Sequence, residues 1–380
     1  MRIVIDGNVI QERLDGVSRY TFNLAQALAN TVLEQDELFI FYEPGKTTPG
    51  QYRIEDLAAH PTVMLRPATG LSRATVQVAL ANALRTVGAD VYHSPYNWLN
   101  FLTNVPTVIT IHELSMFYED EGSESSWISK LSQFTKQAQL SLLHSADAII
   151  CVSEYLRRQL LNMVDVDPDK VHVVYNGVDH SRFHPRYRPE ARHRAARILG
   201  IEPPYVLALA NDQPRKNVRT LLHAYAHLPK DTPTLVLAGA GRWGQGPIYD
   251  MVKKAGIEER VRFTGYVPEA TLPDLYAGSR CFVFPSIYEG FGLPVLEAMA
   301  CSAPVVAGNR TSIPEVAGDA ALLVDPTNVV AMAEAMNRIL SNKQYRDSLR
   351  AKAPGQAAKF SWQRTARETR RIYASVLKEK

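Results

Sequence analysis

The sequence predicts an α/β protein that consists of two doubly wound units in tandem, and three observations support this prediction. Short apolar runs rich in Val, Ile and Phe alternate with longer helical stretches along the chain. Runs of this kind are typical of parallel strands that are buried on both faces of a sheet. The alternating series occurs twice, on either side of a segment rich in proline and arginine, and 380 residues are enough for two domains of ordinary size.

The front half contains seven strand-like runs, most of which end in a polar residue. In order they are "RIVID", "LFIFYE", "TVMLRP", "ADVYHS", "TVITIHE", "DAIICVSE" and "VHVVYNG". Their β-branched and aromatic residues favour strands. Between the first two runs, "SRYTFNLAQALANTV" (18–32) has apolar residues at helical spacing and predicts an amphipathic helix.

The back half repeats the pattern with six further runs. These are "YVLALAND", "TLVLAGA", "VRFTGY", "CFVFPS", "APVVAG" and "AALLVD". Helices are predicted over 218–228, over 329–342 and over the last stretch, 360–380. The segment 179–204 has four prolines and six arginines, so a site that binds phosphate or lipid is one interpretation of it. A solvated interdomain linker with a short helix is the simpler interpretation.

Composition and charge restrict the function. The chain is 46% hydrophobic and 21% charged, as in soluble globular proteins, and no apolar run approaches the roughly 20 residues of a membrane span. Residues 1–190 hold 16 Lys and Arg against 22 Asp and Glu, whereas residues 191–380 hold 26 against 17. We therefore expect an anionic ligand in the back half. The excess is too diffuse for a nucleic-acid partner.

The N-terminus and the cysteines indicate a cytoplasmic location. "MRIVIDGNVI" reads as a strand and a turn rather than as a signal peptide. Cys151, Cys281 and Cys301 lie in apolar surroundings without the spacing of metal ligands. Buried free thiols in a reducing compartment are therefore expected.

The stretch "SIYEGFGLPVLEAMA" combines a glycine-rich turn with two carboxylates. "CFVFPS" before it predicts a buried strand, Gly290 and Gly292 predict a tight turn, and Pro294 suits the first turn of a helix. The amides at such a helix N-terminus bind anions, but Glu289 and Glu297 on either side would repel a phosphate. A ligand that carries both phosphates and hydroxyls would explain the combination.

Polar residues at the strand exits are the other candidates, because open α/β sheets bind ligands at the carboxyl ends of their strands. They are Gly16, His93 and His112 in the front half, and Arg215, Lys216, Gly241, Tyr266 and Glu289 in the back half. Two sheets that face each other would bring both sets to one cleft.

A nucleotide diphospho-sugar fits these side chains. Arg215 and Lys216 are predicted to begin the first helix of the back unit, where cations oppose the helix dipole and a bound diphosphate would compensate them. Glu297, in the first turn of its helix, could accept hydrogen bonds from ribose hydroxyls, and Glu289 from those of a sugar. The phosphates would lie between them on two amides, those of Gly292 and Leu293.

Taken in order, these pieces resemble the retaining GT-B glycosyltransferases of the large GT4 class. "EGFGLPVLE" is similar to their E-x7-E signature, and "DGVSRY" to their N-terminal glycine loop. Further matches, in chain order, are "HE" at 112–113, "VSEYLRRQL", "VYNGVD", "PRKN", "FTGYV" and "GNRTSIPEVAGDAALLVDP". The resemblance covers nearly the whole chain and looks closest to bacterial glycan-assembly transferases.

The resemblance implies a GT-B fold, in which two Rossmann-like domains face a central cleft. The expected domains are 1–180, which would bind the acceptor, and 181–360, which would bind the nucleotide-sugar. A helix over 361–380 would pack back on the N-terminal domain.

The resemblance also implies which residues are catalytic. Arg215 and Lys216 would stabilise the leaving diphosphate, Glu289 would hold the transferred sugar, and His112 would lie beside that sugar. The reaction would retain the anomeric configuration by front-face attack, with the leaving phosphate accepting the proton of the acceptor. No metal and no other cofactor is expected, because Arg, Lys and a helix N-terminus would neutralise the charge.

The implied donor is a UDP- or GDP-hexose, with mannose or glucose transferred to a glycan or a lipid-linked oligosaccharide. Glu297 would hold the ribose, and the loop at Tyr266 and Val267 would hold the base. Gly16 would let the front loop approach the phosphates.

Two positions depart from the pattern of many relatives. Asp15 precedes Gly16 where a glycine pair is common, and Ala210 stands at a strand exit where glycine is common.

The front half is net acidic, so membrane contact is expected to be weak and peripheral, or mediated by the acceptor. A helix over 127–143 carries two lysines that could serve as a local patch, although core packing of its apolar face is the preferred interpretation.

Several alternatives stay open. "GAGRWG" (239–244) satisfies a dinucleotide fingerprint, but it does not follow the first strand of its unit. "DVDPD" (165–169) mimics a metal-binding D-x-D, but a polar turn is expected there. A sugar-nucleotide epimerase of the same fold and a non-catalytic nucleotide-sugar binding protein are the remaining rivals.

Overall fold

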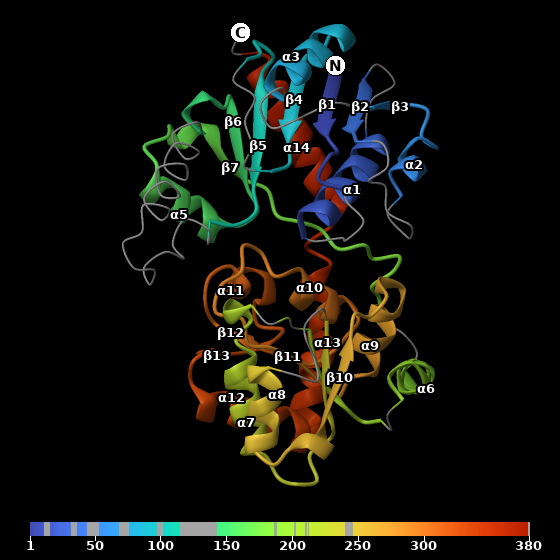
Figure 1. Cartoon of the computed structure of the whole chain (residues 1–380), viewed down its shortest axis with the longest axis vertical. Helices are drawn as coiled ribbons and strands as arrows, with labels where there is room; N and C mark the ends of the chain where they lie inside the picture. Colours follow the sequence, from blue (N-terminus) through green and yellow to red (C-terminus); the bar gives the residue numbers. More distant parts are fainter. Residues whose placement is uncertain are drawn as a thin grey trace. The chain divides into compact units, whose positions relative to one another are not determined.

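The protein divides into two compact α/β units (Figure 1). The structure is a computed structural model, and it describes residues 1–10, 16–31, 36–43, 53–67, 76–96, 102–114, 143–185, 188–200, 203–209, 211, 213–239 and 246–378. Unit 1 comprises Met1–Gly177 together with Trp362–Lys380, and unit 2 comprises Val178–Ser361. Unit 1 is therefore discontinuous in sequence, whereas unit 2 is continuous.

Unit 1 is built on a parallel sheet. Its seven described strands are β1 (Arg2–Asp6), β2 (Glu37–Tyr42), β3 (Val63–Pro67), β4 (Val91–Ser94), β5 (Thr107–Ile111), β6 (Ala148–Cys151) and β7 (Val171–Val173). Their order across the sheet is β3-β2-β1-β4-β5-β6-β7, and every neighbouring pair is parallel. All seven strands predicted in the front half are confirmed. The order reverses between β1 and β4, which makes the sheet doubly wound.

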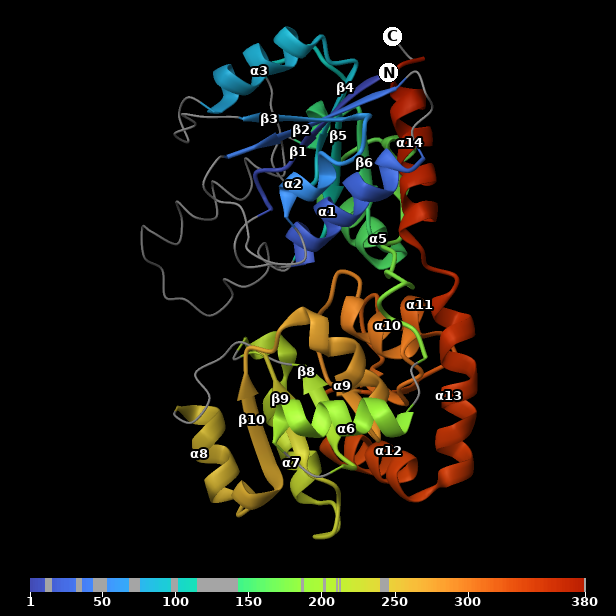
Figure 2. The same cartoon turned by 90° about the vertical axis from the view of Figure 1, so that its right-hand side faces the viewer.

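Helices cover both faces of this sheet. Those described are α1 (Gly16–Ala29), α2 (Ile54–Leu57), α3 (Val76–Val87), α5 (Glu154–Met163) and α14 (Trp362–Val376). Neighbouring residues of β4 point to opposite faces, so Tyr92 packs with Leu80 of α3 while His93 meets Tyr373 of α14. Figure 2 shows α3 on one side of the sheet and α1 beside α14 on the other.

The C-terminal helix α14 is held in unit 1 by polar and apolar contacts. Arg370 donates a hydrogen bond from Nε to Oδ2 of Asp36 at 2.9 Å, and the hydroxyl of Thr365 donates to the carbonyl oxygen of Tyr175 at 2.7 Å. Tyr373 is fully buried between this helix and the sheet. The amphipathic helix predicted at the end of the chain therefore completes the core of the first unit.

Unit 2 is built on a second parallel sheet. Its six described strands are β8 (Val206–Leu209), β9 (Leu235–Ala238), β10 (Val261–Gly265), β11 (Cys281–Phe284), β12 (Val305–Gly308) and β13 (Leu322–Val324). The order is β10-β9-β8-β11-β12-β13, again with parallel pairs throughout. The six predicted strands are confirmed, and the order reverses between β8 and β11. By the rule for open sheets, a ligand site belongs outside the carboxyl ends of these two strands.

The helices of unit 2 also lie on both faces of its sheet. They are α6 (Arg188–Leu199), α7 (Val218–Ala226), α8 (Pro247–Lys254), α9 (Leu272–Gly278), α10 (Leu293–Ala300), α11 (Ile313–Ala317), α12 (Val329–Ser341) and α13 (Lys343–Ala357). On one face α7, α8 and α12 pack against Val206, Leu235 and Val283. On the other face Tyr276 of α9 meets the ring of Phe282, with centroids 5.1 Å apart. Helix α6 comes from the arginine-rich segment and packs on α9, so that segment is more than a linker (Figure 2).

The three cysteines are free and buried, as predicted. Burial raises the pKa of the Cys151 and Cys281 thiols to about 12. Thiols of this kind are protonated near neutral pH and are poor nucleophiles, so cysteine chemistry has no place in the site that follows.

Candidate active site

The site in unit 2 begins with a turn after β8. Pro214–Lys216 forms a single 3-10 turn, and Asn217, in the left-handed conformation with φ 53°, separates this turn from α7. The prediction that Arg215 and Lys216 begin a helix is therefore wrong in detail, because α7 starts only at Val218. The side-chain Nδ2 of Asn217 donates to the carbonyl oxygens of Pro285 at 3.1 Å and Pro326 at 2.6 Å, which ties the turn to the segments after β11 and β13.

Glu289 lies between the two cations of this turn. Its Oε1 accepts a hydrogen bond from Nζ of Lys216 at 2.7 Å, and its Oε2 lies 3.6 Å from Nη1 of Arg215. The hydroxyl of Ser286 also donates to Oε1. We expected a bound diphosphate to be needed to compensate the cations. In the structure the single carboxylate of Glu289 offsets only part of this positive charge, and with 8% of its surface exposed it is itself buried. Diphosphate binding at these cations stays a prediction.

The main chain around Glu289 is fixed from two sides. The amide of Ile287 donates to the carbonyl oxygen of Arg215 at 2.8 Å. The hydroxyl of Ser312 lies 2.9 Å from the carbonyl oxygen of Glu289, and the hydroxyl of Thr311 accepts from the amide of Glu289 at 3.2 Å. The carboxylate is therefore held by a preorganised loop rather than by its own ion pairs alone.

The glycine-rich turn leads directly into α10, as predicted. Gly292 has φ +106°, a conformation that favours glycine, and a Cβ there would lie 2.5 Å from Cδ1 of Ile313. Pro294 occupies the first turn of α10, where its missing N–H costs no hydrogen bond. The amides of Gly292 and Leu293 thus stand at the N-terminus of a helix, next to the loop that carries Glu289.

Glu297 occupies a different position from the one predicted. Helix α10 begins at Leu293, so Glu297 lies in its second turn rather than in its first. The side chain is 1% exposed, and its Oε2 accepts a hydrogen bond from the hydroxyl of Tyr276 at 3.0 Å. Tyr276 itself is fully buried. The carboxylate is therefore covered in this structure, and its contact with ribose stays a prediction.

Tyr266 and Val267 follow β10, the edge strand of the sheet. Tyr266 is 73% exposed, whereas Val267 is buried. Gly265 has φ +69°, and its carbonyl oxygen accepts from the amide of Gly239 at 2.9 Å, which anchors the end of β10 to β9. The structure therefore brings Arg215, Lys216 and Glu289 into contact, and it places the Tyr266 loop at the same carboxyl edge, beyond β9.

Two of the three candidates of unit 1, His112 and Gly16, lie at the end of a strand and at the start of a helix. His112 follows β5, and its Nε2 donates to the carbonyl oxygen of Pro95 at 3.0 Å. The ring of Tyr20 meets the ring of His112 edge to face, with centroids 4.5 Å apart. Gly16 is the first residue of α1 and is exposed. Apart from its chain neighbours and the backbone of its own helix, no atom of the described residues lies within 4 Å of the position that a Cβ would take.

His93 is not a site residue, although its place at a strand exit made it a candidate. It lies inside β4, is fully buried, and has both ring nitrogens bonded, Nδ1 to the hydroxyl of Tyr373 and Nε2 to that of Thr110 at 2.8 Å. Burial, and to a lesser degree the nearby His112, lowers the pKa of His93 to about 3. This histidine is a neutral part of the core.

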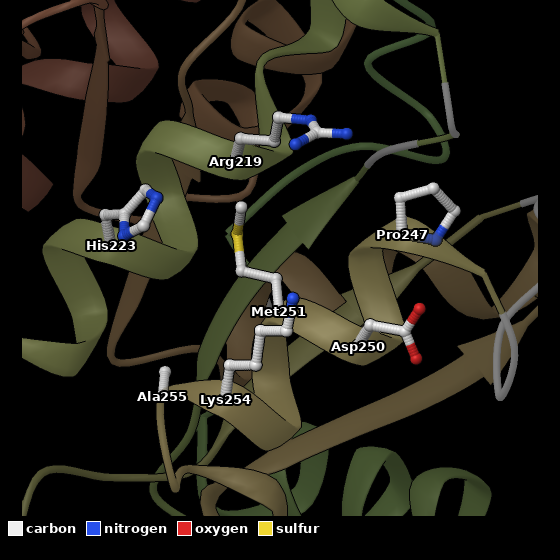
Figure 3. A pocket seen from close by; sticks show the side chains of 7 residues that line it. All are labelled: Arg219, His223, Pro247, Asp250, Met251, Lys254 and Ala255. Carbon is white, nitrogen blue, oxygen red and sulfur yellow. The ribbon is translucent and has the colours of Figure 1, made fainter.

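A cavity of about 560 Å³ lies between α7 and α8 (Figure 3). Its lining residues are Arg219, His223, Pro247, Asp250, Met251, Lys254 and Ala255. Figure 3 shows the side chain of Met251 reaching between the two helices. None of the predicted site residues lines this cavity, so it is separate from the group around Glu289.

The segment "DVDPD", which mimics a metal-binding D-x-D, forms a capped turn in the structure. Asp167 of "DVDPD" accepts a hydrogen bond from the amide of Asp169 at 3.0 Å and caps the 3-10 turn Pro168–Lys170, which is the expected polar turn. Within the described part of the chain, no group of three or more His, Cys, Asp and Glu side chains is arranged to hold a metal ion.

Some predictions lie outside the described residues. They concern Asp15, Ala210, Gly241 with most of "GAGRWG", and the helix over 127–143. No described helix is both long enough and apolar enough to cross a membrane.

Ser286, Ser312 and Tyr276 contact the two glutamates but were not predicted as site residues. Ser286 ends the run "CFVFPS", and a polar residue at the exit of an apolar strand is the signal that could have identified it. Ser312 and Tyr276 gave no such signal. Ser312 precedes α11 and Tyr276 lies within α9, and they reach Glu289 and Glu297, 23 and 21 positions away, only in the folded unit.

Comparison with known proteins identifies this architecture. Sucrose-phosphate synthase from Thermosynechococcus elongatus has a TM-score of 0.77 at 22% identity, with all of both chains covered. A structure of Anabaena Alr3699/HepE in complex with UDP and glucose also has a TM-score of 0.77, at 18% identity, covering 98% of this chain and 99% of that one. The protein therefore has the GT-B fold of glycosyltransferases.

Sequence matches then give the family. Residues 14–182 match the family described as Glycosyltransferase Family 4, and residues 191–356 match Glycosyl transferases group 1. The O-antigen chain mannosyltransferase B of Escherichia coli is 31% identical over 390 residues, which cover 98% of this chain and 99% of that protein. The chain belongs to the GT4-like GT-B glycosyltransferases, and the predicted family and enzyme class are confirmed.

Proposed function

We propose that this glycosyltransferase moves a hexose from a GDP- or UDP-sugar to a hydroxyl of a glycan or of a lipid-linked oligosaccharide, with retention of configuration. Mannose is the preferred sugar and glucose the alternative. The choice of mannose is supported by the similarity, over nearly the whole chain, to a protein named as a mannosyltransferase.

The contact of Lys216 and Arg215 with Glu289 carries the proposal. These side chains lie at the switch point between β8 and β11, beside the N-terminus of α10. A diphosphate placed on the amides of Gly292 and Leu293 would have both cations within reach. The carboxylate of Glu289 would accept hydrogen bonds from hydroxyls of the sugar.

In the proposed reaction, the bond between the anomeric carbon and the diphosphate oxygen breaks while a bond from that carbon to the acceptor oxygen forms. The proton of the acceptor hydroxyl passes to the leaving phosphate oxygen. Negative charge grows on the diphosphate during this step, so Lys216 and Arg215 stabilise the transition state more than the bound donor. In this scheme the two cations stabilise the negative charge of the leaving diphosphate, and no metal takes part.

The remaining candidates take supporting roles. Glu297 would hold the ribose after a local opening that exposes its carboxylate, and the Tyr266 loop would hold the base. His112 would contact the transferred sugar. Gly16 would leave room for phosphate at the start of α1, which is supported by the space that the described residues outside its helix leave at its Cβ position.

Thermal unfolding with GDP, UDP, ADP and their mannose and glucose derivatives tests the donor. A nucleotide at a hundredfold excess over its Kd stabilises the folded protein by about 2.7 kcal/mol. Release of the nucleotide in the presence of a mannan or glucan oligosaccharide, with the anomeric configuration of the product read by NMR, then tests the reaction.

Two variants make this test specific. Lys216→Ala should lower the rate of transfer about 100-fold, while Lys230→Ala, at an exposed lysine of the same unit, should transfer normally. Binding of a nucleotide-sugar without transfer to any glycan would favour the non-catalytic binding protein. Conversion of the free nucleotide-sugar to its epimer would favour the epimerase.

A further inference from the structure

Four arginines gather around Gly278–Arg280, at the amino end of β11. They are Arg192 of α6, Arg280 just before β11, and Arg346 and Arg350 of α13. The strand that follows has four residues, so roughly 13 Å of chain separate this cluster from the loop of Glu289 at the other end. The arginine cluster is therefore distinct from the donor site proposed above.

Several contacts place these four residues near one another. The Cα of Arg192 lies 3.4 Å from the position that a Cβ on Gly278 would take. Arg350 donates from Nη2 to the carbonyl oxygen of Ser279 at 3.3 Å. Arg346 precedes Arg350 by one helical turn, so both lie on the same face of α13. Figure 2 shows α6 lying against α9, the helix that ends at Gly278.

The two arginines of α13 are buried and serve the fold in part. Arg346 is 3% exposed and donates from Nη1 to the carbonyl oxygens of Ile339 and Leu340, at 2.7 and 3.0 Å, at the end of α12. Arg350 is 8% exposed. The buried Nε of Arg346 has no hydrogen-bond partner among the described residues, and neither has the buried Nε of Arg192. Buried donors of this kind normally find an acceptor.

Positive charge exceeds negative charge in the cluster. Asp347 is the carboxylate that faces it, at 3.5 Å from Nη1 of Arg350, but Asp347 also pairs with Lys343 at 2.7 Å. Asp274 is engaged by Arg194, with a contact of 2.8 Å. Burial, followed by the neighbouring guanidinium groups of Arg346 and Arg192, lowers the pKa of Arg280, which indicates repulsion between these cations.

We propose that the arginine cluster binds a phosphate group, with Arg192 and Arg280 as its principal ligands. Both side chains are partly exposed, so an anion can reach them from solvent. Guanidinium groups match phosphate oxygens in pairs of parallel hydrogen bonds, so the anion would accept from the solvent-facing nitrogens of Arg192 and Arg280 and would supply the missing negative charge. The phosphate could belong to a small soluble anion or to a lipid headgroup, because both present the same oxygens.

The test uses the full chain and the double variant Arg192→Gln/Arg280→Gln. The arginines of α13 are left intact, because they hold the end of α12 and their loss would disturb folding. Arg197→Gln is the matched control, since Arg197 is an exposed arginine on the same helix as Arg192. The probe is inorganic pyrophosphate, measured by calorimetry and by the thermal midpoint in phosphate-free buffer. All measurements are repeated on a Lys216→Gln background, which weakens any binding of pyrophosphate at the donor site.

On the Lys216→Gln background, we expect pyrophosphate to bind and to raise the thermal midpoint, with the control equal to the parent. The double variant should bind at least tenfold more weakly. It should also have a higher thermal midpoint than the parent without pyrophosphate, because cation repulsion is removed. Equal pyrophosphate affinity in the double variant and the control would overturn the site for a soluble anion.

Sedimentation with vesicles distinguishes the lipid source. If a headgroup supplies the phosphate, phosphatidylglycerol vesicles should pellet the parent and the control but not the double variant, and phosphatidylcholine vesicles should pellet none of them. Pyrophosphate binding without such pelleting assigns the site to a soluble anion. Absence of both effects rejects the proposal.

Discussion

Lys216 and Glu289 join the two loops that follow β8 and β11, through a hydrogen bond of 2.7 Å from Nζ to Oε1. Lys216 also lies over the ring of Phe284, with Nζ 5.2 Å from its centroid. The lysine is thus oriented before any donor arrives. A bound diphosphate would compete with Glu289 for this cation, and sugar hydroxyls would compete with Lys216 for the carboxylate.

Removal of either cation should affect turnover more than donor binding. Lys216→Ala and Arg215→Ala are each expected to lower kcat about 100-fold, because charge on the diphosphate grows in the transition state. The Kd for the nucleotide-sugar should change much less. Steady-state kinetics with isothermal titration of the same donor measures both quantities, with Lys230→Ala as control. Equal losses in binding and turnover would remove the transition-state role.

Glu297 should matter for the nucleotide rather than for the sugar. Glu297→Gln keeps the size of the side chain but weakens its capacity to accept hydrogen bonds from ribose, at a cost of about 1–3 kcal/mol in binding of UDP or GDP. Tyr276→Phe, which removes only the phenolic hydroxyl facing Glu297, serves as the matched control. If Glu297→Gln binds the nucleotide as tightly as the parent, the ribose role is excluded.

The strands could be predicted well from the sequence because each is a short apolar run buried on both faces, and such runs usually form strands. It predicted the turn from Glu289 to Pro294 for a local reason, since glycine and proline act within a few residues. It did not predict the pairing of Lys216 with Glu289, which depends on β8 and β11 being neighbours although 71 residues separate Leu209 from Cys281. His93 failed as a candidate for a similar reason, because its partner Tyr373 lies 280 residues away.

The helix α13 was not among the predictions. Pro354 and Gly355 lie inside it, and both residues normally argue against a helix interior. Tertiary contacts outweigh this local preference. Leu349 packs in the core of unit 2, and Gln356 donates to the carbonyl oxygen of Val316 at 3.0 Å.

Acid should destabilise unit 1 through His93. The folded protein keeps this histidine neutral with a pKa of about 3, whereas the unfolded chain has the ordinary value near 6.5. The unfolded state therefore binds more protons between these values, so stability is complete above about pH 6.5 and falls as the pH drops, by about 1 kcal/mol for each pH unit. Between pH 7.5 and 4.5, thermal unfolding should show a smaller loss of stability for His93→Gln than for the parent, although the variant is less stable at pH 7.5. His60→Gln should follow the parent.

The contact of Arg370 with Asp36 should hold α14 more strongly at neutral than at acid pH. Burial raises the pKa of Asp36, but hydrogen bonds from the amino group of Met1 and from Arg370 outweigh it and leave the pKa below its usual value. The carboxylate thus contributes stability above about pH 4, and this contribution disappears as the pH falls through the lowered pKa. Hydrogen exchange over residues 362–376 should be faster in Arg370→Ala at pH 7, and the difference from the parent should shrink at pH 3. Arg364→Ala, on the exposed side of the helix, provides the control.

The return of α14 to unit 1 reverses the usual order in which domains mature during synthesis. Residues 178–361 form a continuous unit, and all of them leave the ribosome before Trp362–Val376 can cover Tyr20 and His93. The first unit to be translated is therefore the last to close its core. During that interval its sheet exposes an apolar face that Tyr373 and Ile372 will later bury, and exposed faces of this kind attract chaperones and favour aggregation. The nascent sheet of unit 1 therefore stays without α14 for as long as it takes to translate an entire second domain.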